Sequence, residues 1–150
     1  MIGLFEALAG DDGLPALIDT NLFAPLALSR DLLPLLQAGA PSRIVNIGSL
    51  VGDVALPLFS PYAASKFGLR GFSNTLRREW ATLDIGVTYV APRGAQTDAA
   101  RRLASVLDRL AMPLDTPAAI ATQVWGQPNA PESRDSARDA SEIVCYRIDI

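Results

Sequence analysis

The chain has 150 residues, of which 49% are hydrophobic, which is enough for one compact domain with its own core. It has no histidine and a single cysteine, Cys145, which excludes Ser-His-Asp and Cys-His nucleophiles, zinc sites with histidine ligands and an internal disulfide. The net charge of −3 gives no basic footprint, so we expect no nucleic-acid partner, and we also expect no metal site. An enzyme of this composition must find its acid, base and cation among Asp, Glu, Tyr, Ser, Arg and Lys66, the only lysine.

No targeting or membrane segment is expected. The N-terminal run Met1–Glu6 has no basic residue and no long apolar stretch, unlike a signal peptide. The most apolar tract, Leu14–Leu36, is interrupted by charged residues and prolines, which excludes a spanning helix. We therefore expect a cytoplasmic protein with no membrane partner.

The first half of the chain alternates helical and strand patterns. Leucines at helical spacing predict a long helix over 16–37, and the short apolar run Arg43–Ile47 predicts a buried strand. Ser60 followed by Pro61 predicts an N-cap with proline at the first helical position, and the helix it begins is expected to reach about residue 83.

The second half repeats the alternation before it changes character. Gly86–Ala91 predicts another strand, and Thr97 and Thr116 are predicted to cap helices that run to about Leu110 and Trp125. This order indicates an α/β fold with a parallel sheet over residues 1–125. Residues 126–150 form a polar tail expected to be linker or disordered, with a possible last strand at 142–150.

The lone lysine has a tyrosine one helical turn before it. Tyr62 and Lys66 are four residues apart near the start of a predicted helix, so both side chains are expected on one face. An adjacent ammonium and the positive end of a helix both stabilise a phenolate, which would make Tyr62 a usable proton donor and acceptor. The same spacing is also common in surface pairs without chemistry.

Two more polar residues lie where the predicted elements could bring them to a ligand site. Ser49 follows the first predicted strand, and the carboxyl ends of parallel strands line ligand crevices in such folds. Asn21 lies four residues before Pro25, which has no N–H, so the carbonyl of Asn21 lacks its helical partner and could hold a water. Taken alone, Ser49 is as readily a turn hydroxyl and Asn21 a surface helix residue.

Four runs of sequence carry a family resemblance: DTNL at 19–22, RIVNIGS at 43–49, YAASKFGLRGF at 62–72 and VAPRGAQT at 90–97. Together they resemble the short-chain dehydrogenase/reductase family, over about residues 1–125. The resemblance implies the C-terminal portion of a Rossmann-like doubly wound parallel sheet, incomplete, with two or three strands and flanking helices. It also implies NAD or NADP as cofactor and a small-molecule carbonyl or alcohol as substrate.

The resemblance implies a role for each residue that matches the family's pattern. In that family the tyrosine donates or accepts the substrate proton, the lysine holds the nicotinamide ribose, the serine orients the substrate carbonyl and the asparagine holds a water. These catalytic roles fall on Tyr62, Lys66, Ser49 and Asn21. The implied cofactor contacts are Tyr62, Lys66, Pro92, Gly94 and Thr97.

The sequence also departs from the family's pattern. It contains no glycine-rich TGxxxGxG run and no Asn-Asn-Ala-Gly stretch, and Arg93 interrupts the Pro-Gly pair after the second strand. We therefore expect an N-terminally truncated, catalytic half that lacks roughly 80–90 residues of the nucleotide-binding half, at about 30 residues per βαβ unit. Arg93 has two readings, a contact to an acidic substrate or cofactor group and a local ion pair.

Two functions remain open. The first is an NAD(P)-dependent oxidoreductase that interconverts a carbonyl and an alcohol, with Tyr62 as the proton donor and acceptor. The alternative is a non-catalytic fragment that acts through dimerisation, because helices 16–37 and 61–83 resemble the pair that forms the family's dimer interface. A homo-oligomer is expected in either case, and a strand edge exposed at Arg43–Ile47 would also favour pairing with another chain.

Overall fold

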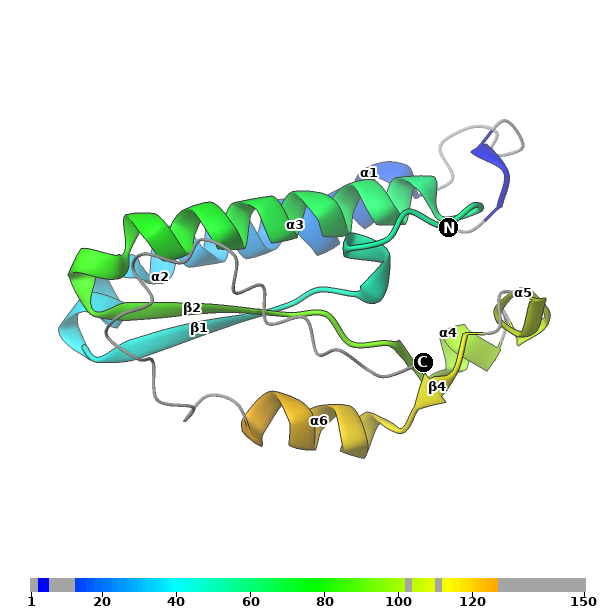
Figure 1. Ribbon diagram of the computed structural model, residues 1–150. Coiled ribbons are helices and arrows are strands. Elements are labelled where there is room, and N and C mark those ends of the chain that lie inside the picture. The colour runs from blue at the N-terminus through cyan, green and yellow to red at the C-terminus, as the bar shows by residue number, and fades with distance from the viewer. Residues whose placement is uncertain (1–2, 6–12, 102–103, 110–111, 127–150) are drawn as a thin grey trace.

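The computed structural model describes residues 3–5, 13–101, 104–109 and 112–126, and Figure 1 shows a layered α/β arrangement. Two parallel strands, β1 (Ser42–Ile47) and β2 (Ile85–Val90), form the central layer. Helices α2 and α3 lie over one face of these strands and α6 lies on the opposite side. The predicted α/β class with a parallel sheet is confirmed; the tail predicted at 126–150 lies, apart from Gly126, outside the described residues.

The first helical stretch contains a π turn. It consists of α1 (Leu14–Ile18), a π-helix η2 (Asp19–Phe23) and α2 (Ala24–Ala38), so the predicted helix over 16–37 is confirmed in position. The backbone N–H of Ala24 bonds the carbonyl of Asp19, five residues earlier. Pro25 has no N–H to give, and the backbone widens by one residue at this point. The sequence pattern did not predict this widening.

A single crossover helix joins the two strands. Helix α3 (Ser60–Glu79) and the 3-10 turn η4 (Ala81–Leu83) match the predicted helix over 61–83. The strands pair in parallel from Ser42 opposite Ile85 to Ile47 opposite Val90. The predicted Ser60 N-cap is wrong, because the cap position is Phe59 and no side chain caps the helix.

The core lies where α3 returns to β2. Leu76 and Trp80 at the end of α3 are buried against Ile85 and Val87 of β2. Within this layer the buried amide of Asn46 donates to the Ser73 hydroxyl at 2.9 Å, and that hydroxyl donates to a backbone carbonyl within α3. The pair satisfies two polar groups that burial would otherwise penalise. It also connects α3 to β1.

Five elements are described in the chain after β2. They are β3 (Gly94–Ala95), α4 (Asp98–Arg101), α5 (Ala104–Arg109), β4 (Leu114–Asp115) and α6 (Pro117–Gly126). The predicted caps are confirmed, because the hydroxyls of Thr97 and Thr116 accept from N–H groups three residues later, each at 3.2 Å. Of the helix predicted from Thr97 to Leu110, the structure describes helix at α4 and α5, while residues 102–103 between them and Leu110 lie outside the described residues. The two-residue pairing of β3 with β4 was not predicted.

A buried tyrosine of β2 lies directly beneath the turn that follows β1. Tyr89 is 8% exposed, and a Cβ at Gly48 would overlap its ring. A Cβ at Gly52 would overlap the Tyr89 hydroxyl. Glycine is therefore required at both positions by the close approach of this side chain.

We predict that Gly48→Ala lowers the free energy of unfolding by about 1–3 kcal/mol, because the added methyl overpacks the space that Tyr89 fills. The matched control is Gly71→Ala on α3, where a Cβ meets nothing within 4 Å. That change is expected to raise stability by about 0.5–1 kcal/mol, as alanine is the better helix former. Urea unfolding followed by circular dichroism measures both, and equal effects at the two glycines would contradict the packing described.

Candidate active site

Ser49 is held at the end of β1 by backbone bonds on either side of it. The N–H of Gly48 donates to Val90 O at 2.7 Å, and the N–H of Leu50 donates to Pro92 O at 3.0 Å. The parallel pairing therefore continues past the last residues of both strands. As a result Ser49 lies at the carboxyl edge of the sheet, where the sequence placed it, and the short helix η3 (Leu50–Gly52) begins there.

Tyr62 and Lys66 share one face of the first turns of α3. The Lys66 Nζ atom lies 5.7 Å from the centre of the Tyr62 ring, within the range of a cation–π contact. The same ammonium donates to the Ile47 carbonyl at 3.1 Å. Lys66 therefore connects the start of α3 to the end of β1, two residues before Ser49, and brings three of the predicted catalytic residues to one edge.

Partial burial lowers the pKa of the Lys66 ammonium from its ordinary value of 10.5. The cause is loss of solvation, which penalises the charged form. An ammonium has three donors, and the Ile47 carbonyl takes one. The remaining donors give the site a cation with capacity for further acceptors.

Asn21 reaches the site through a serine that the sequence analysis missed. The Asn21 amide donates to the Ser65 hydroxyl at 3.4 Å, and that hydroxyl donates to the Tyr62 carbonyl at 2.7 Å. Ser65 has no exposed surface. Its position three residues after Tyr62, on the inner face of α3, was the available sequence signal. The π turn is thereby tied to the helical turn that carries Tyr62.

Small residues allow this close contact between helices. A Cβ at Gly68 would lie 3.0 Å from a methyl group of Leu22, the residue after Asn21. The π turn thus packs against α3 where Ser65 and Gly68 leave room. Asn21 and Lys66 also line one groove of about 470 Å³, so the fourth predicted catalytic residue lies beside the lysine.

A buried polar group beneath the site was also missed. The Arg70 guanidinium lies 3.1 Å from an oxygen of Asp53, although neither that oxygen nor the Tyr89 hydroxyl has a hydrogen-bond partner among the described residues. The Ser49 N–H approaches the Tyr89 hydroxyl without reaching hydrogen-bond geometry. Burial raises the pKa of Tyr89, and burial raises the pKa of Asp53 against the opposing effect of Arg70. Burial thus shifts both pKa values in the direction of the protonated form.

The three predicted cofactor residues after β2 have structural roles of their own. Pro92 accepts the bond that holds the Ser49 turn. Gly94 leaves space for Leu114, whose side chain a Cβ would overlap. The Thr97 hydroxyl caps α4, and Thr97 also lines an apolar pocket of about 490 Å³ beside β1.

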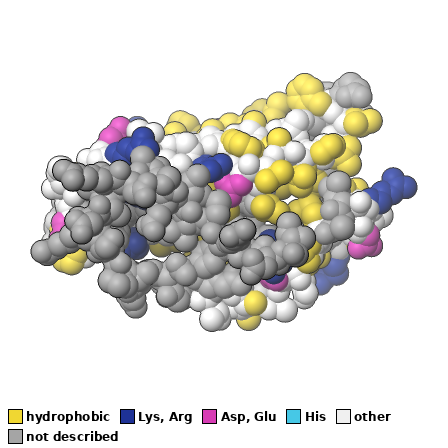
Figure 2. Space-filling model, in the orientation of Figure 1, with side chains coloured by type: hydrophobic (Ala, Val, Ile, Leu, Met, Phe, Trp, Pro, Cys, Tyr) yellow, Lys and Arg dark blue, Asp and Glu magenta, His cyan; other side chains and the backbone are white. Residues whose placement is uncertain are grey.

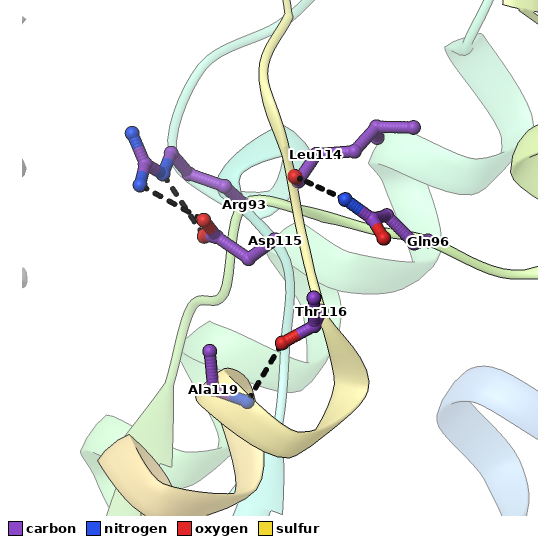
Figure 3. A network of polar contacts seen from close by, with 6 residues as sticks. All are labelled: Arg93, Gln96, Leu114, Asp115, Thr116 and Ala119. Atoms are coloured by element: carbon purple, nitrogen blue, oxygen red, sulfur yellow. Dashed lines mark hydrogen bonds and ion pairs between the residues drawn. The ribbon is translucent and has the colours of Figure 1, made fainter.

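Arg93 makes the local ion pair. Its guanidinium donates two hydrogen bonds of 3.1 Å to the carboxylate of Asp115, in the fork-like arrangement that Figure 3 shows. In the same network the Gln96 amide donates to the Leu114 carbonyl at 3.1 Å. Of the two readings of Arg93, the ion pair is the one observed. This ion pair holds the residue before β3 against β4, at the two ends of the intervening segment.

The surroundings of Tyr62 are apolar. Its ring packs against the buried cluster of Val51, Phe59, Ala63 and Leu107, which joins α3 to α5. Figure 2 shows hydrophobic side chains gathered at the end of the molecule where α1 and the start of α3 lie. Ser49, Lys66 and Asn21 are thus polar groups at an otherwise apolar edge, a combination typical of small-molecule sites.

Two kinds of feature are absent from the described part of the chain. Within residues 3–5, 13–101, 104–109 and 112–126, no group of three or more Cys, Asp or Glu side chains is arranged to hold a metal ion. In that same part, no helix has the length and apolar character needed to cross a bilayer.

Residues 2–107 match the family described as short chain dehydrogenase. A 3-oxoacyl-(acyl-carrier-protein) reductase from Salmonella typhimurium is 40% identical over 93 residues, which are 62% of this chain and 38% of that protein. Dehydrogenase/reductase SDR family member 7B from Xenopus laevis is 38% identical over 81 residues, which are 54% of this chain and 25% of that protein. The match therefore spans between a quarter and two fifths of these relatives.

Solved structures show the same likeness in three dimensions. A 4-hydroxyisoleucine dehydrogenase complexed with NADH superposes with a TM-score of 0.69 at 28% identity, covering 83% of this chain and 55% of the other. A gluconate 5-dehydrogenase from Burkholderia cenocepacia, in complex with NADP and tartrate, gives a TM-score of 0.64 at 26% identity, covering 69% and 40%. The Rossmann-type arrangement implied by the sequence is confirmed in this partial form.

The lowered pKa of Lys66 predicts how stability depends on pH. Between the folded-state pKa and the unfolded value of 10.5, the unfolded chain binds a proton that the folded chain does not. The free energy of unfolding therefore rises with pH in this window, and the gain is lost as pH falls through the folded-state pKa. Urea unfolding measures the free energy of unfolding of the wild type and of Lys66→Met. The wild-type value minus the variant value should increase as pH rises toward 10.5. A flat or falling difference would show that the ammonium is not desolvated.

Proposed function

Because the chain belongs to the short chain dehydrogenase family, we propose that it serves an oxidoreductase reaction that interconverts a carbonyl and an alcohol. The observation that carries the proposal is the meeting of Ser49, Tyr62 and Lys66 at one edge of the sheet, with the ammonium 5.7 Å from the Tyr62 ring centre. We propose Tyr62 as the proton donor and acceptor. The relatives of the chain are named as dehydrogenases and reductases, which supports the reaction class.

Each side chain has a role that its chemistry allows. In the reductive direction the O–H bond of Tyr62 breaks as its proton passes to the substrate oxygen, and Tyr62 becomes a phenolate. The Ser49 hydroxyl donates a hydrogen bond to the same oxygen and orients the carbonyl. The Lys66 ammonium stabilises the phenolate until the proton is restored. Asn21, which is tied to the Tyr62 backbone through Ser65, holds a water of the proton relay in this proposal.

NAD or NADP is the cofactor class we propose, and it supplies or accepts the hydride when bound. The residues present fit the nicotinamide end of such a cofactor. Lys66 has donors left for ribose hydroxyls after bonding the Ile47 carbonyl, and Pro92, Gly94 and Thr97 follow β2 at the same edge. One structural neighbour is complexed with NADH and another with NADP, so both forms stay in the proposal. The sequence has no glycine-rich run, and pyrophosphate binding is assigned to no residue of this chain.

Removing the Tyr62 hydroxyl tests the proposal. With a panel of small ketones and either NADH or NADPH, Tyr62→Phe should lower kcat by about 10²–10⁴-fold, the usual contribution of a positioned proton donor. Lys66→Ala should abolish the same activity. Tyr146→Phe, which removes a hydroxyl elsewhere in the chain, is the matched control and should keep the wild-type rate. Equal rates for wild type and Tyr62→Phe, or no turnover by the wild type, would count against the reaction.

A second candidate function is self-association through the helices over 16–37 and 61–83. Exposed aromatic side chains favour it, because Phe23 is 64% exposed at the π turn and Phe67 is 40% exposed on α3. Large apolar side chains of this kind are enriched at interfaces between protein chains. We propose this association whether or not the chain turns over substrate.

Replacing both aromatic side chains with glutamine tests this association. Size-exclusion chromatography with light scattering should show a dimer for the wild type and a shift to monomer for the Phe23→Gln, Phe67→Gln variant. Arg78→Gln, at an exposed position of α3, is a control that should leave the dimer intact. A wild-type chain that stays monomeric at micromolar concentration would rule out this candidate.

A further inference from the structure

The backbone is strained at Leu58, four residues before Tyr62. Its φ angle is +74°, in the left-handed region that glycine adopts readily and that a bulky side chain avoids. Such a conformation persists only where the surrounding structure holds it, and it concentrates at functional sites. Two contacts hold Leu58. Its carbonyl accepts from the Gly3 N–H at 2.9 Å, and its side chain packs against the buried apolar cluster that Tyr62 also contacts.

Leu58 is one of several apolar side chains that share this buried cluster with Tyr62. They come from the loop before α3, from α5, and from β4 with the residues just before it. We call the larger ones the apolar wall: Leu56, Leu58, Val106, Met112 and Leu114. Each is only partly buried, so each retains accessible surface near the candidate proton donor.

The apolar wall is joined to both polar groups that would contact a substrate carbonyl. The Val51 N–H, which belongs to the buried cluster, donates to the Ser49 hydroxyl at 3.2 Å. Ala63, another member of that cluster, directly follows Tyr62. A substrate whose oxygen lies between the Ser49 and Tyr62 hydroxyls therefore has apolar side chains beside the rest of its atoms.

The arginine that follows β2 is charge-balanced within the chain. The Arg93 guanidinium donates two hydrogen bonds of 3.1 Å, one to each carboxylate oxygen of Asp115. A guanidinium held in this way has already made the bidentate pair by which arginine recognises a carboxylate or phosphate. The Gln96 amide and the Thr97 hydroxyl likewise bond backbone groups of the same segment. These polar groups stabilise the segment, and its contribution beside Tyr62 is apolar.

We propose that the site takes a ketone, or the matching secondary alcohol, with an uncharged alkyl or aryl substituent, and that Leu58 is a residue that selects it. This proposal rests on the carbonyl–alcohol reaction proposed above and adds the class of substrate. Each methyl or methylene group that the apolar wall buries favours binding by about fourfold. A carboxylate in the same place would give up its hydration to apolar side chains, which opposes binding.

Two ligands of matched shape test the substrate class. Methyl isoamyl ketone and levulinate are both methyl ketones that branch at the far end, into two methyl groups in the first and a carboxylate in the second. Titration of the full chain, followed by NMR of labelled leucine methyl groups, should show about tenfold or tighter binding of methyl isoamyl ketone. The Leu58 signals should be among those that move. Equal or tighter binding of levulinate, or Leu58 signals that do not move, would overturn the proposal.

Two substitutions at Leu58 separate ligand selection from stability. Leu58→Gly and Leu58→Ala both remove the apolar side chain, but only glycine adopts a φ of +74° without strain. We expect Leu58→Gly to unfold at a higher urea concentration than Leu58→Ala. Both variants should lower the preference for methyl isoamyl ketone over levulinate by about fivefold or more. A preference that followed the stability of the variants, or that neither variant changed, would show that Leu58 does not select the ligand.

Leu83→Ala is the matched control, because Leu83 is a partly buried leucine that packs against the other core cluster, which contains Trp80 and Ile85. This variant should be less stable than the wild type and should keep the ligand preference. A lost preference in Leu83→Ala would overturn the assignment to Leu58.

The binding comparison needs no turnover, so it is separate from the test of the reaction. Tyr62→Phe should keep the preference for methyl isoamyl ketone while it loses activity, because the ring and its apolar contacts remain. A chain that prefers this ketone without turning it over would support the ligand class and count against the reaction. A chain that turns over levulinate faster than methyl isoamyl ketone would support the reaction and overturn the ligand class.

Discussion

The parallel pairing of β1 with β2 continues beyond both strands, and the whole candidate site depends on that continuation. Gly48 and Leu50 bond to Val90 and Pro92, so the backbone is still fixed after the side-chain pattern of a strand has ended. Ser49 lies between these two bonds. Lys66 reaches the last carbonyl of β1. The turn, the helix start and the sheet edge are thereby locked to one another through main-chain groups.

Main-chain anchoring leaves hydrogen-bonding capacity on the polar side chains of the candidate site. Among the described residues, the Ser49 hydroxyl accepts one local bond, from the Val51 N–H at 3.2 Å, and keeps its own proton to donate. Lys66 retains donors as well. Below them the Tyr89 ring fills the space under the turn and supports it from the core side. The site is thus rigid in its backbone and open in its polar groups, as a pre-organised site requires.

Much of this arrangement could be predicted from local sequence patterns. The spacing of Tyr62 and Lys66 placed them on one helical face, and the apolar run before Ser49 placed it at a strand end. The contacts between elements could not be predicted in this way. Ser65 joins Asn21 to Tyr62 across two helices, and Tyr89 contacts a turn 37 or more residues before it. Such contacts depend on how whole elements pack together, and the local periodicity of residues does not report this packing.

Local rules also misplaced some boundaries. Ser60 has the composition of a cap, yet the helix starts at that residue with Phe59 in the cap position. After Thr97 the described residues form α4 and α5, and the ion pair of Arg93, the residue before β3, with Asp115 of β4 holds these two segments together. Ser60 shows that residue preference alone does not decide where a helix begins.

The π turn at Asp19–Phe23 has a consequence for helical phase. Successive residues of an α-helix are rotated by about 100°, so one additional residue in a turn offsets everything before it by about that angle. Along this continuous helical stretch, α1 contacts α3, whereas α2 contacts β1 as well as α3. A single helix without the offset would present one stripe to one neighbour. The widened turn lets one helical stretch contact both α3 and β1, and Asn21 lies within that turn.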